Sequence, residues 1–162
     1  MDYLWSPWRY KYVADAGKQE ECVFCAALAA NDDEKRLIVH RGKLCFVILN
    51  LYPYTTGHAM VVPYKHVPDL AGSDGDALSE MILLAKRLQE ALQEIYKPDG
   101  FNLGINIGRS AGAGVVGHLH MHVLPRWMGD TNFMTTVGET RVHPEDLQQT
   151  YAKLRPRFAG GA

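Results

Sequence analysis

The chain has 162 residues, of which 47% are hydrophobic and 22% are charged. This length and composition are those of one ordinary globular domain, so we expect a single domain over residues 1–162. The net charge of −1 argues against a nucleic-acid partner held by a basic surface, but it allows a small nucleotide. No apolar run reaches the roughly 18 residues that span a bilayer, and no signal-peptide pattern opens the chain, so we expect a cytoplasmic protein without a membrane partner.

The first half of the chain predicts short strands. Residues 1–21 are rich in aromatic side chains but show no period, and we interpret them as an N-terminal arm that packs on another surface. Apolar runs at 37–40 and 44–49 flank a turn at 41–43, which is typical of two paired strands. A third strand is expected at 58–62, after the break at 53–57.

The second half predicts a long helix, two more strands and a final helix. Over 76–96 apolar residues recur at three- and four-residue steps, with Ser73 or Asp74 as the cap and Pro98 and Gly100 at the end. Strands are expected at 101–107 and 118–124, joined by a glycine-rich loop, and a helix at 144–157 within a C-terminal extension from 128 to 162. This pattern predicts an α+β fold: an antiparallel β-sheet with one long helix and a C-terminal helix.

Three histidines alternate with apolar residues in the last predicted strand. Because alternate side chains of a strand share a face, His118, His120 and His122 should project together while their apolar neighbours enter the core. Surface histidines, or a metal ion bound by all three, are alternative interpretations. Histidine is well suited to attack phosphorus, because near pH 7 it is largely neutral and one ring nitrogen carries a free lone pair.

The glycine-rich loop at 106–114 directly precedes these histidines. Glycines let the backbone approach a ligand closely and direct N–H groups at phosphate oxygens, although they also form ordinary turns. The position of the loop beside three convergent histidines favours the phosphate interpretation. Arg126 is the nearest cation in the sequence, and it can attract a polyphosphate without taking part in the chemistry.

The segment His118-Leu119-His120-Met121-His122-Val123-Leu124 resembles the signature of the histidine triad (HIT) superfamily. The block from Asn50 through 57–63 to His66 is similar to the upstream strand of that superfamily. Residues 4–9 and 125–134 resemble the branch that contains Fhit and the diadenosine tetraphosphate hydrolases and phosphorylases. The resemblance covers nearly the whole chain and implies a single HIT-like domain and an enzyme.

The resemblance also implies a role for each matching position. His120 would be the nucleophile that forms a nucleotidyl-histidine intermediate, and His122 and His58 would bind and orient phosphate oxygens. The remaining positions imply nucleotide contacts: Asn50 to the ribose, Ile48 and Leu51 to the base, Asn106 to the phosphate chain, and Ser110, Gly112 and Gly114 in the loop around it.

Cys22 and Cys25 have the spacing with which two thiolates reach one metal ion, and a redox pair is the rival interpretation. In metal-bearing members of the superfamily, the first triad histidine and the histidine after the upstream strand complete the site. Those positions are His118 and His66, so the resemblance implies a structural zinc ion. Cys45 lies in an apolar strand and is interpreted as a packing residue.

The expected reaction is hydrolysis of a dinucleoside polyphosphate, such as diadenosine tetraphosphate, at an α-phosphate, with Mg²⁺ able to accompany the substrate. Many members carry a hydroxyl or amide side chain where this chain has Gly114 and Val115, so we favour water over phosphate as the acceptor. Phosphorolysis, phosphoramidase activity, a non-catalytic nucleotide sensor and a plain metal-binding domain are the alternatives. A homodimer is implied by resemblance alone.

Overall fold

The computed structural model describes residues 21–132, 135, 137 and 145–159. Almost all of the N-terminal arm expected at 1–21, and part of the C-terminal extension expected at 128–162, therefore lie outside the described residues. Among the described residues, no helix is both long and apolar enough to cross a bilayer.

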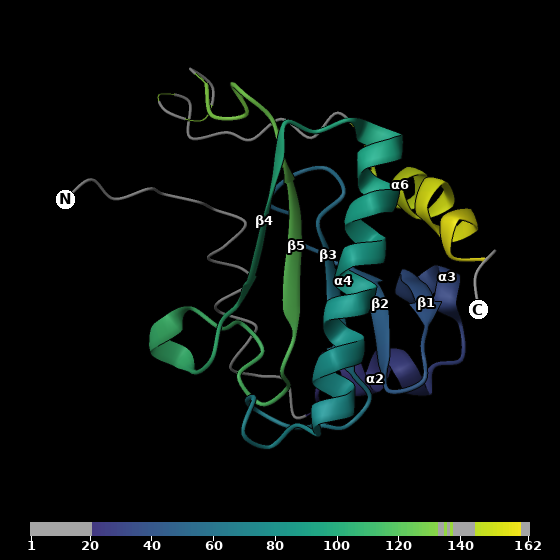
Figure 1. Ribbon diagram of the computed structural model, residues 1–162, viewed down its shortest axis with the longest axis vertical. Helices are drawn as coiled ribbons and strands as arrows, with labels where there is room; N and C mark the ends of the chain where they lie inside the picture. Colours follow the sequence, from purple (N-terminus) through teal and green to yellow (C-terminus); the bar gives the residue numbers. More distant parts are fainter. Residues whose placement is uncertain (1–20, 133–134, 136, 138–144, 160–162) are drawn as a thin grey trace.

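Five antiparallel strands form one sheet with the order β1-β2-β3-β5-β4 (Figure 1). The strands are β1 (Ile38–Arg41), β2 (Cys45–Leu49), β3 (Ala59–Pro63), β4 (Gly100–Ile105) and β5 (Met121–Arg126). This arrangement, with the helices described below, confirms the predicted α+β fold. Because β4 pairs antiparallel with β5, with Ile105 opposite Met121, the segments after β4 and before β5 lie side by side at one end of the sheet.

The last strand begins later than the sequence predicts. A strand is expected from 118, but the regular ladder starts at Met121, so the first two triad histidines precede it. The backbone N–H of Leu119 donates instead to the carbonyl of Val67, at 2.6 Å, which holds this segment against the end of β3. At Leu119 the backbone hydrogen bond is therefore made to the loop after β3 rather than to a neighbouring strand.

The long helix α4 (Gly75–Tyr96) lies across one face of the sheet (Figure 1). Its buried side chains follow the three- and four-residue spacing of the sequence, and they meet the inward-facing residues of β2, β3 and β5 in the main core. The helix ends at Lys97, which adopts a left-handed conformation while its N–H donates to the carbonyl of Gln93. The helix expected at 144–157 is observed as α6 (Leu147–Leu154) followed by the 3-10 turn η2 (Arg155–Phe158).

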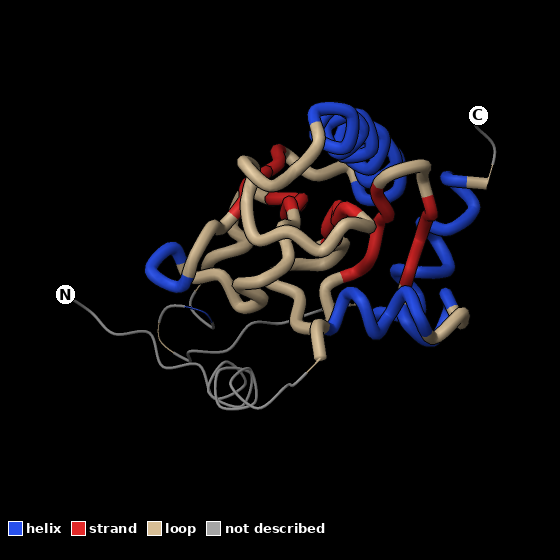
Figure 2. Tube along the Cα trace, turned by 90° about the horizontal axis from the view of Figure 1, so that it is seen from below, coloured by secondary structure: helices blue, strands red, loops and turns tan. Residues whose placement is uncertain are grey.

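Two short helices, α2 (Val23–Ala29) and α3 (Asp33–Arg36), were not predicted. The buried residues Phe24 and Ala27 of α2 form a second core on the opposite face of the sheet, with Ile38, Phe46, Ile48, Met60 and Val62. In Figure 2 the long helix α4 lies above the strands, on the face opposite to this second core. Because both faces are covered, β2 and β3 are buried along their whole length and do not alternate.

Candidate active site and metal centre

The triad histidines lie on the face of the sheet that α2 covers. His122 is paired with Met60 of β3 and with Gly104 of β4, and Met60 is paired with Ile48 of β2. Directly paired residues project to the same face, so these four positions form one row across the sheet. The apolar residues that alternate with the histidines, Leu119, Met121 and Val123, belong instead to the main core, which α4 covers. The alternation expected from the sequence is therefore present, although it begins before the strand.

Aromatic contacts connect the three imidazoles: His120 contacts His122, and Phe24 contacts His118 and His120. The ring centroids of His120 and His122 are 4.9 Å apart, in an edge-on arrangement. The Phe24 ring lies 5.4 Å from that of His118 and 5.1 Å from that of His120. His118 and His120 are only 0% and 4% exposed, which excludes the interpretation of these two as surface histidines.

A hydrogen bond determines which nitrogen of His120 is free. Its Nδ1 lies 2.7 Å from the backbone carbonyl oxygen of His118, and a carbonyl can only accept, so Nδ1 carries the proton. The neutral ring then has its lone pair on Nε2. Burial lowers the pKa of His120, which keeps the ring neutral in neutral solution. The structure thus gives His120 one defined nucleophilic atom.

His58 and His122 form the end of a directed hydrogen-bond chain. The backbone N–H of Tyr54 donates to Nδ1 of His58, at 3.1 Å, so the His58 proton is on Nε2. That Nε2 lies 2.9 Å from Nδ1 of His122, which must accept, and the His122 proton is therefore on its own Nε2. Burial, followed by the nearby histidines, lowers the pKa of His58 to about 3 and that of His122 to about 4. His122 is consequently a neutral donor.

The expected nucleotide contacts are only partly assembled around the histidines. The Asn50 side-chain amide lies 3.3 Å from Nδ1 of His58 and accepts a hydrogen bond from the Tyr52 backbone, at 2.9 Å. Ile48 is buried on the same face as His122, whereas Leu51 is 62% exposed at the surface. The two expected base-contacting residues thus differ sharply in environment.

The glycine-rich loop follows β4 at the triad end of the sheet. Ile105, the last residue of β4, is paired with Met121, so Asn106 emerges beside the segment that carries His120. The loop then turns through η1 (Arg109–Ala111), with positive φ at Gly108 and Gly112. Ser110 and Gly112 are exposed and Gly114 is half-buried. Among the hydrogen bonds of the described residues, none joins this loop to the histidines.

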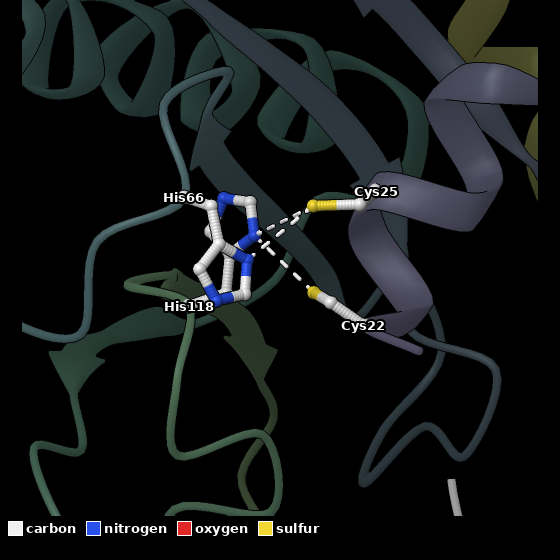
Figure 3. Close-up of side chains that lie close together, drawn as sticks. All are labelled: Cys22, Cys25, His66 and His118. Atoms are coloured by element: carbon white, nitrogen blue, oxygen red, sulfur yellow. Dashed lines mark hydrogen bonds between the residues drawn. The ribbon is translucent and has the colours of Figure 1, made fainter. Parts of the chain in front are cut away.

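A second cluster joins the two cysteines to two histidines (Figure 3). Nδ1 of His118 lies 3.3 Å from Sγ of Cys22 and 3.7 Å from Sγ of Cys25, and Nδ1 of His66 lies 3.4 Å from Sγ of Cys25. All four ligand atoms lie within 4.8 Å of one another. Around a tetrahedral zinc ion, sulfur and nitrogen ligands are about 3.6 Å apart, so the observed distances fit that ion.

The surroundings of this cluster also suit a metal. Nε2 of His118 lies 2.8 Å from the carbonyl oxygen of Pro63, to which it donates, and this leaves the lone pair on the Nδ1 that faces the thiols. A Cβ added at Gly117 would lie 3.3 Å from Nε2 of His66, so a larger residue would crowd that ligand. Imidazole nitrogens directed at both sulfurs favour a metal centre over a redox pair. Cys45 is fully buried elsewhere, as expected of a packing residue.

Arg126 forms an ion pair with Asp130. Its Nε and Nη2 donate to the two carboxylate oxygens of Asp130, at 2.7 and 3.0 Å, and its Nη1 donates to Asn102, at 2.7 Å. The hydrogen bond from Arg126 lowers the pKa of Asp130 to about 2. The guanidinium is thus held in a partly exposed ion pair at the end of β5, and its attraction for a polyphosphate stays a prediction.

Two contacts of the site were not predicted from the sequence. Phe24 covers His118 and His120, and its place between the two cysteines was the available signal. The Tyr54 ring stacks on His58, with centroids 5.0 Å apart. Tyr54 lies in the turn at 53–57, where the sequence shows no period that would assign its direction.

Comparisons with known proteins agree with this geometry. The model of the HIT domain matches residues 31–128. The chain is 39% identical to AP-4-A phosphorylase of Mycobacterium tuberculosis (strain ATCC 25618 / H37Rv), over 98% of this chain and 85% of that protein. It is 28% identical to bis(5'-nucleosyl)-tetraphosphatase [asymmetrical] of Schizosaccharomyces pombe, over 76% of this chain and 68% of that protein. Both of these relatives carry the names of enzymes.

A solved structure shares the fold. The crystal structure of a Zn-bound histidine triad family protein from Mycobacterium smegmatis superposes with a TM-score of 0.70 and 28% identity, covering 86% of this chain and 94% of that one. The match to the domain model covers more than half of the chain, and the similarity to the phosphorylase extends over almost all of it. The chain therefore belongs to the histidine triad (HIT) family, in which the relatives named above are enzymes.

Proposed function

We propose that the chain transfers a nucleotidyl group from a dinucleoside polyphosphate, with His120 as the nucleophile. The observation that carries this proposal is the hydrogen bond from Nδ1 of His120 to the carbonyl of His118, because it leaves Nε2 with a lone pair. Burial keeps that ring neutral, as a nucleophile requires. The two named enzyme relatives support a substrate of this class.

In the proposed first step, Nε2 of His120 attacks the α-phosphorus. A P–N bond forms, the bond from phosphorus to the bridging oxygen breaks, and the remaining nucleotide leaves with that oxygen and its electron pair. The Nε2–H of His122, oriented by His58, would donate to a phosphate oxygen as negative charge develops. An acceptor then attacks the phosphorus and the P–N bond breaks, which restores His120.

The other nucleotide contacts are proposed on family resemblance and position. Asn50, beside His58, would meet the ribose, and Ile48 and Leu51 would flank the base. The segment after β4 would surround the phosphate chain through Asn106, Ser110, Gly112 and Gly114. Mg²⁺ can accompany the phosphates of the substrate, which are negatively charged.

The acceptor has two candidates. Gly114 and Val115 offer no polar side chain for a bound phosphate, which favours water and thus hydrolysis. The named phosphorylase, however, is similar over 98% of this chain, whereas the named tetraphosphatase is similar over 76%. This similarity favours inorganic phosphate as the acceptor, with ADP among the products. Products from diadenosine tetraphosphate, measured with and without phosphate, decide between AMP with ATP and ADP with ATP.

We also propose that the thiol and imidazole cluster holds a structural zinc ion, with Cys22, Cys25, His66 and His118 as ligands. The ion would supply a closed tetrahedral centre and no open position for a reactant. Its ligands come from the start of α2, from the segment after β3 and from the segment before β5. The ion would therefore hold α2 against the triad.

A homodimer formed along the free edge of the sheet is a further proposal. β4 is one of the two edge strands of the sheet, paired only with β5 among the described strands, and its residue Leu103 is 46% exposed. Ile82 and Leu83 of α4 are 57% and 65% exposed. Light scattering on the purified chain would give the mass of a dimer; the mass of a monomer at micromolar concentration would contradict this proposal.

Intact-mass spectrometry tests the proposed chemistry directly. The chain mixed with diadenosine tetraphosphate and quenched rapidly should gain the mass of one AMP group, located on His120. His120→Ala should bind the nucleotide but show neither adduct nor turnover, while His40→Ala, which lies outside the site against Phe158, should behave as the wild type. Normal turnover by His120→Ala would refute the proposal, and a stable adduct without turnover would indicate a nucleotide sensor. Turnover of phosphoramidates in preference to diadenosine tetraphosphate would instead indicate a phosphoramidase.

A further inference from the structure

Phe24 occupies a position that links the metal ligands to the nucleophile. It lies between Cys22 and Cys25 in sequence, and its side chain is 3% exposed. The edge-on contact to His118 reaches a metal-site residue, and the tilted contact to His120 reaches the proposed nucleophile. One buried ring therefore touches both centres.

The hydrogen bond from Nδ1 of His120 to the carbonyl of His118 does not by itself fix the orientation of the ring. The bond from Nδ1 to the His118 carbonyl fixes the proton and one direction, at 2.7 Å. The ring is bonded to Cβ through Cγ and hydrogen-bonded through the adjacent Nδ1, so it can still tilt about the line through these two atoms. Such a tilt moves the reactive Nε2, which lies across Cε1 from Nδ1. The rings of Phe24 and His122 both contact this imidazole, with centroids 5.1 and 4.9 Å from its own, and such contacts restrict the tilt.

The position of the Phe24 side chain depends in turn on residues 22–25, here called the cysteine turn. Helix α2 has only seven residues, and its N-cap residue, Cys22, makes no side-chain capping hydrogen bond. A helix of this length has little stability of its own, so its place is determined by the contacts at its ends and by its buried face. The contacts of Cys22 and Cys25 with His118 and His66 hold the turn that carries Phe24.

We propose that Phe24 is a positioning residue that holds the His120 imidazole in its reactive orientation, and that the cysteine turn fixes Phe24 for this purpose. The inference rests on the proposed function, in which His120 is the attacking group. It assigns to the cysteine turn an effect on the rate of transfer as well as on stability.

The test compares Phe24→Leu with the matched control Phe46→Leu in the full chain. Phe46 belongs to the same core cluster and is fully buried, but its ring stacks on Tyr64 and not on a histidine. On diadenosine tetraphosphate, Phe24→Leu should lower kcat about tenfold or more with KM within about twofold, and Phe46→Leu should keep kcat within about twofold of wild type. Both variants should keep the wild-type metal content.

Imidazole nuclear magnetic resonance gives a second readout that does not depend on turnover. The Cε1–H resonance of His120 reports motion of the ring about its hydrogen bond; it should be sharp in the wild type and in Phe46→Leu, and broadened in Phe24→Leu. If Phe24→Leu does not fold, Phe24→Met takes its place, with the same expectations. Absence of turnover in the wild type would refute the proposed function, and this spectrum alone would then test the positioning role.

Three results would overturn the inference. An unchanged His120 signal in Phe24→Leu would show that the ring does not need Phe24. A raised KM with unchanged kcat would assign Phe24 to nucleotide binding. Equal losses of kcat in Phe24→Leu and Phe46→Leu would indicate general loosening of the second core.

Discussion

Nε2 of His58 lies 2.9 Å from Nδ1 of His122; His58 is buried and His122 is half-buried. The N–H of Tyr54 determines the proton position on His58, and His58 in turn determines it on His122. The direction in which His122 can donate is therefore set two hydrogen bonds away, by a backbone amide in a turn. The proposed role of His58 is therefore to orient His122, whereas the proposed role of His120 is to attack the phosphorus.

Replacing His58 should slow the reaction without abolishing it. In His58→Ala the orientation of His122 and its proton is no longer fixed, and one oriented donor to a phosphate oxygen typically contributes about 10²–10³ in kcat. We expect a loss of that size, smaller than the loss in His120→Ala, with the nucleotidyl adduct still detectable by intact mass. A wild-type rate in His58→Ala would contradict the donor role of His122, and His40→Ala serves as the control.

The buried histidines should make the protein less stable in acid. The folded-state pKa is about 3 for His58 and about 4 for His122, both below the ordinary value of 6.5. At pH values between the folded-state pKa and 6.5, each of these histidines is protonated in the unfolded chain and neutral in the folded chain. The free energy of unfolding is therefore greatest above about pH 6.5 and falls as the pH decreases toward the folded-state pKa values. At pH 5 each histidine should cost about 2 kcal/mol of unfolding free energy.

Denaturant unfolding at pH 7 and pH 5 measures this effect. Protonation of the metal ligands also weakens folding in acid, so the comparison is between the wild type and His58→Ala. The variant should lose less unfolding free energy between the two pH values, by about 2 kcal/mol. Equal losses in the two proteins would show that His58 is not the group responsible.

Metal content should depend on the four clustered ligands and not on Cys45. Protein purified without added zinc should retain about one equivalent, and Cys22→Ser should retain less than half, because only three ligands remain. Cys45→Ala is the control, since its thiol is buried in the main core and donates to the carbonyl of Ala77, at 3.3 Å. A wild-type content below half an equivalent would count against a structural zinc ion.

The sequence predicted those elements whose residues repeat over several turns. α4 has 22 residues with a regular apolar spacing, so its two ends were placed within one residue. α2 has seven residues and α3 has four, and neither is long enough to show a period. Because these helices were missed, burial of both faces of β2 and β3 was not anticipated.

The sequence predicted which residues form the site, but not the proton positions or the hydrogen-bond partners of their side chains. The alternation of the histidines indicated one shared face, and family resemblance was needed to bring Cys22 and Cys25 together with His66 and His118. Proton positions depend on partners distant in sequence, such as the Pro63 carbonyl for His118. For the same reason, the sequence alone does not show that Arg126 is paired with Asp130.

The last prediction concerns Glu80, which connects α4 to the turn between β1 and β2. Its carboxylate accepts hydrogen bonds from the backbone N–H groups of Lys43, Leu44 and Cys45, at 2.7, 2.5 and 3.1 Å. Glu80→Ala leaves these three donors without their acceptor, and we expect a loss of about 1–3 kcal/mol of unfolding free energy. Glu90→Ala on the same helix is the control, because Glu90 forms only an exposed pair with Lys86, at 3.6 Å, and should change stability by less than about 0.5 kcal/mol. Denaturant unfolding measures both variants, and equal effects would show that the turn does not depend on this carboxylate.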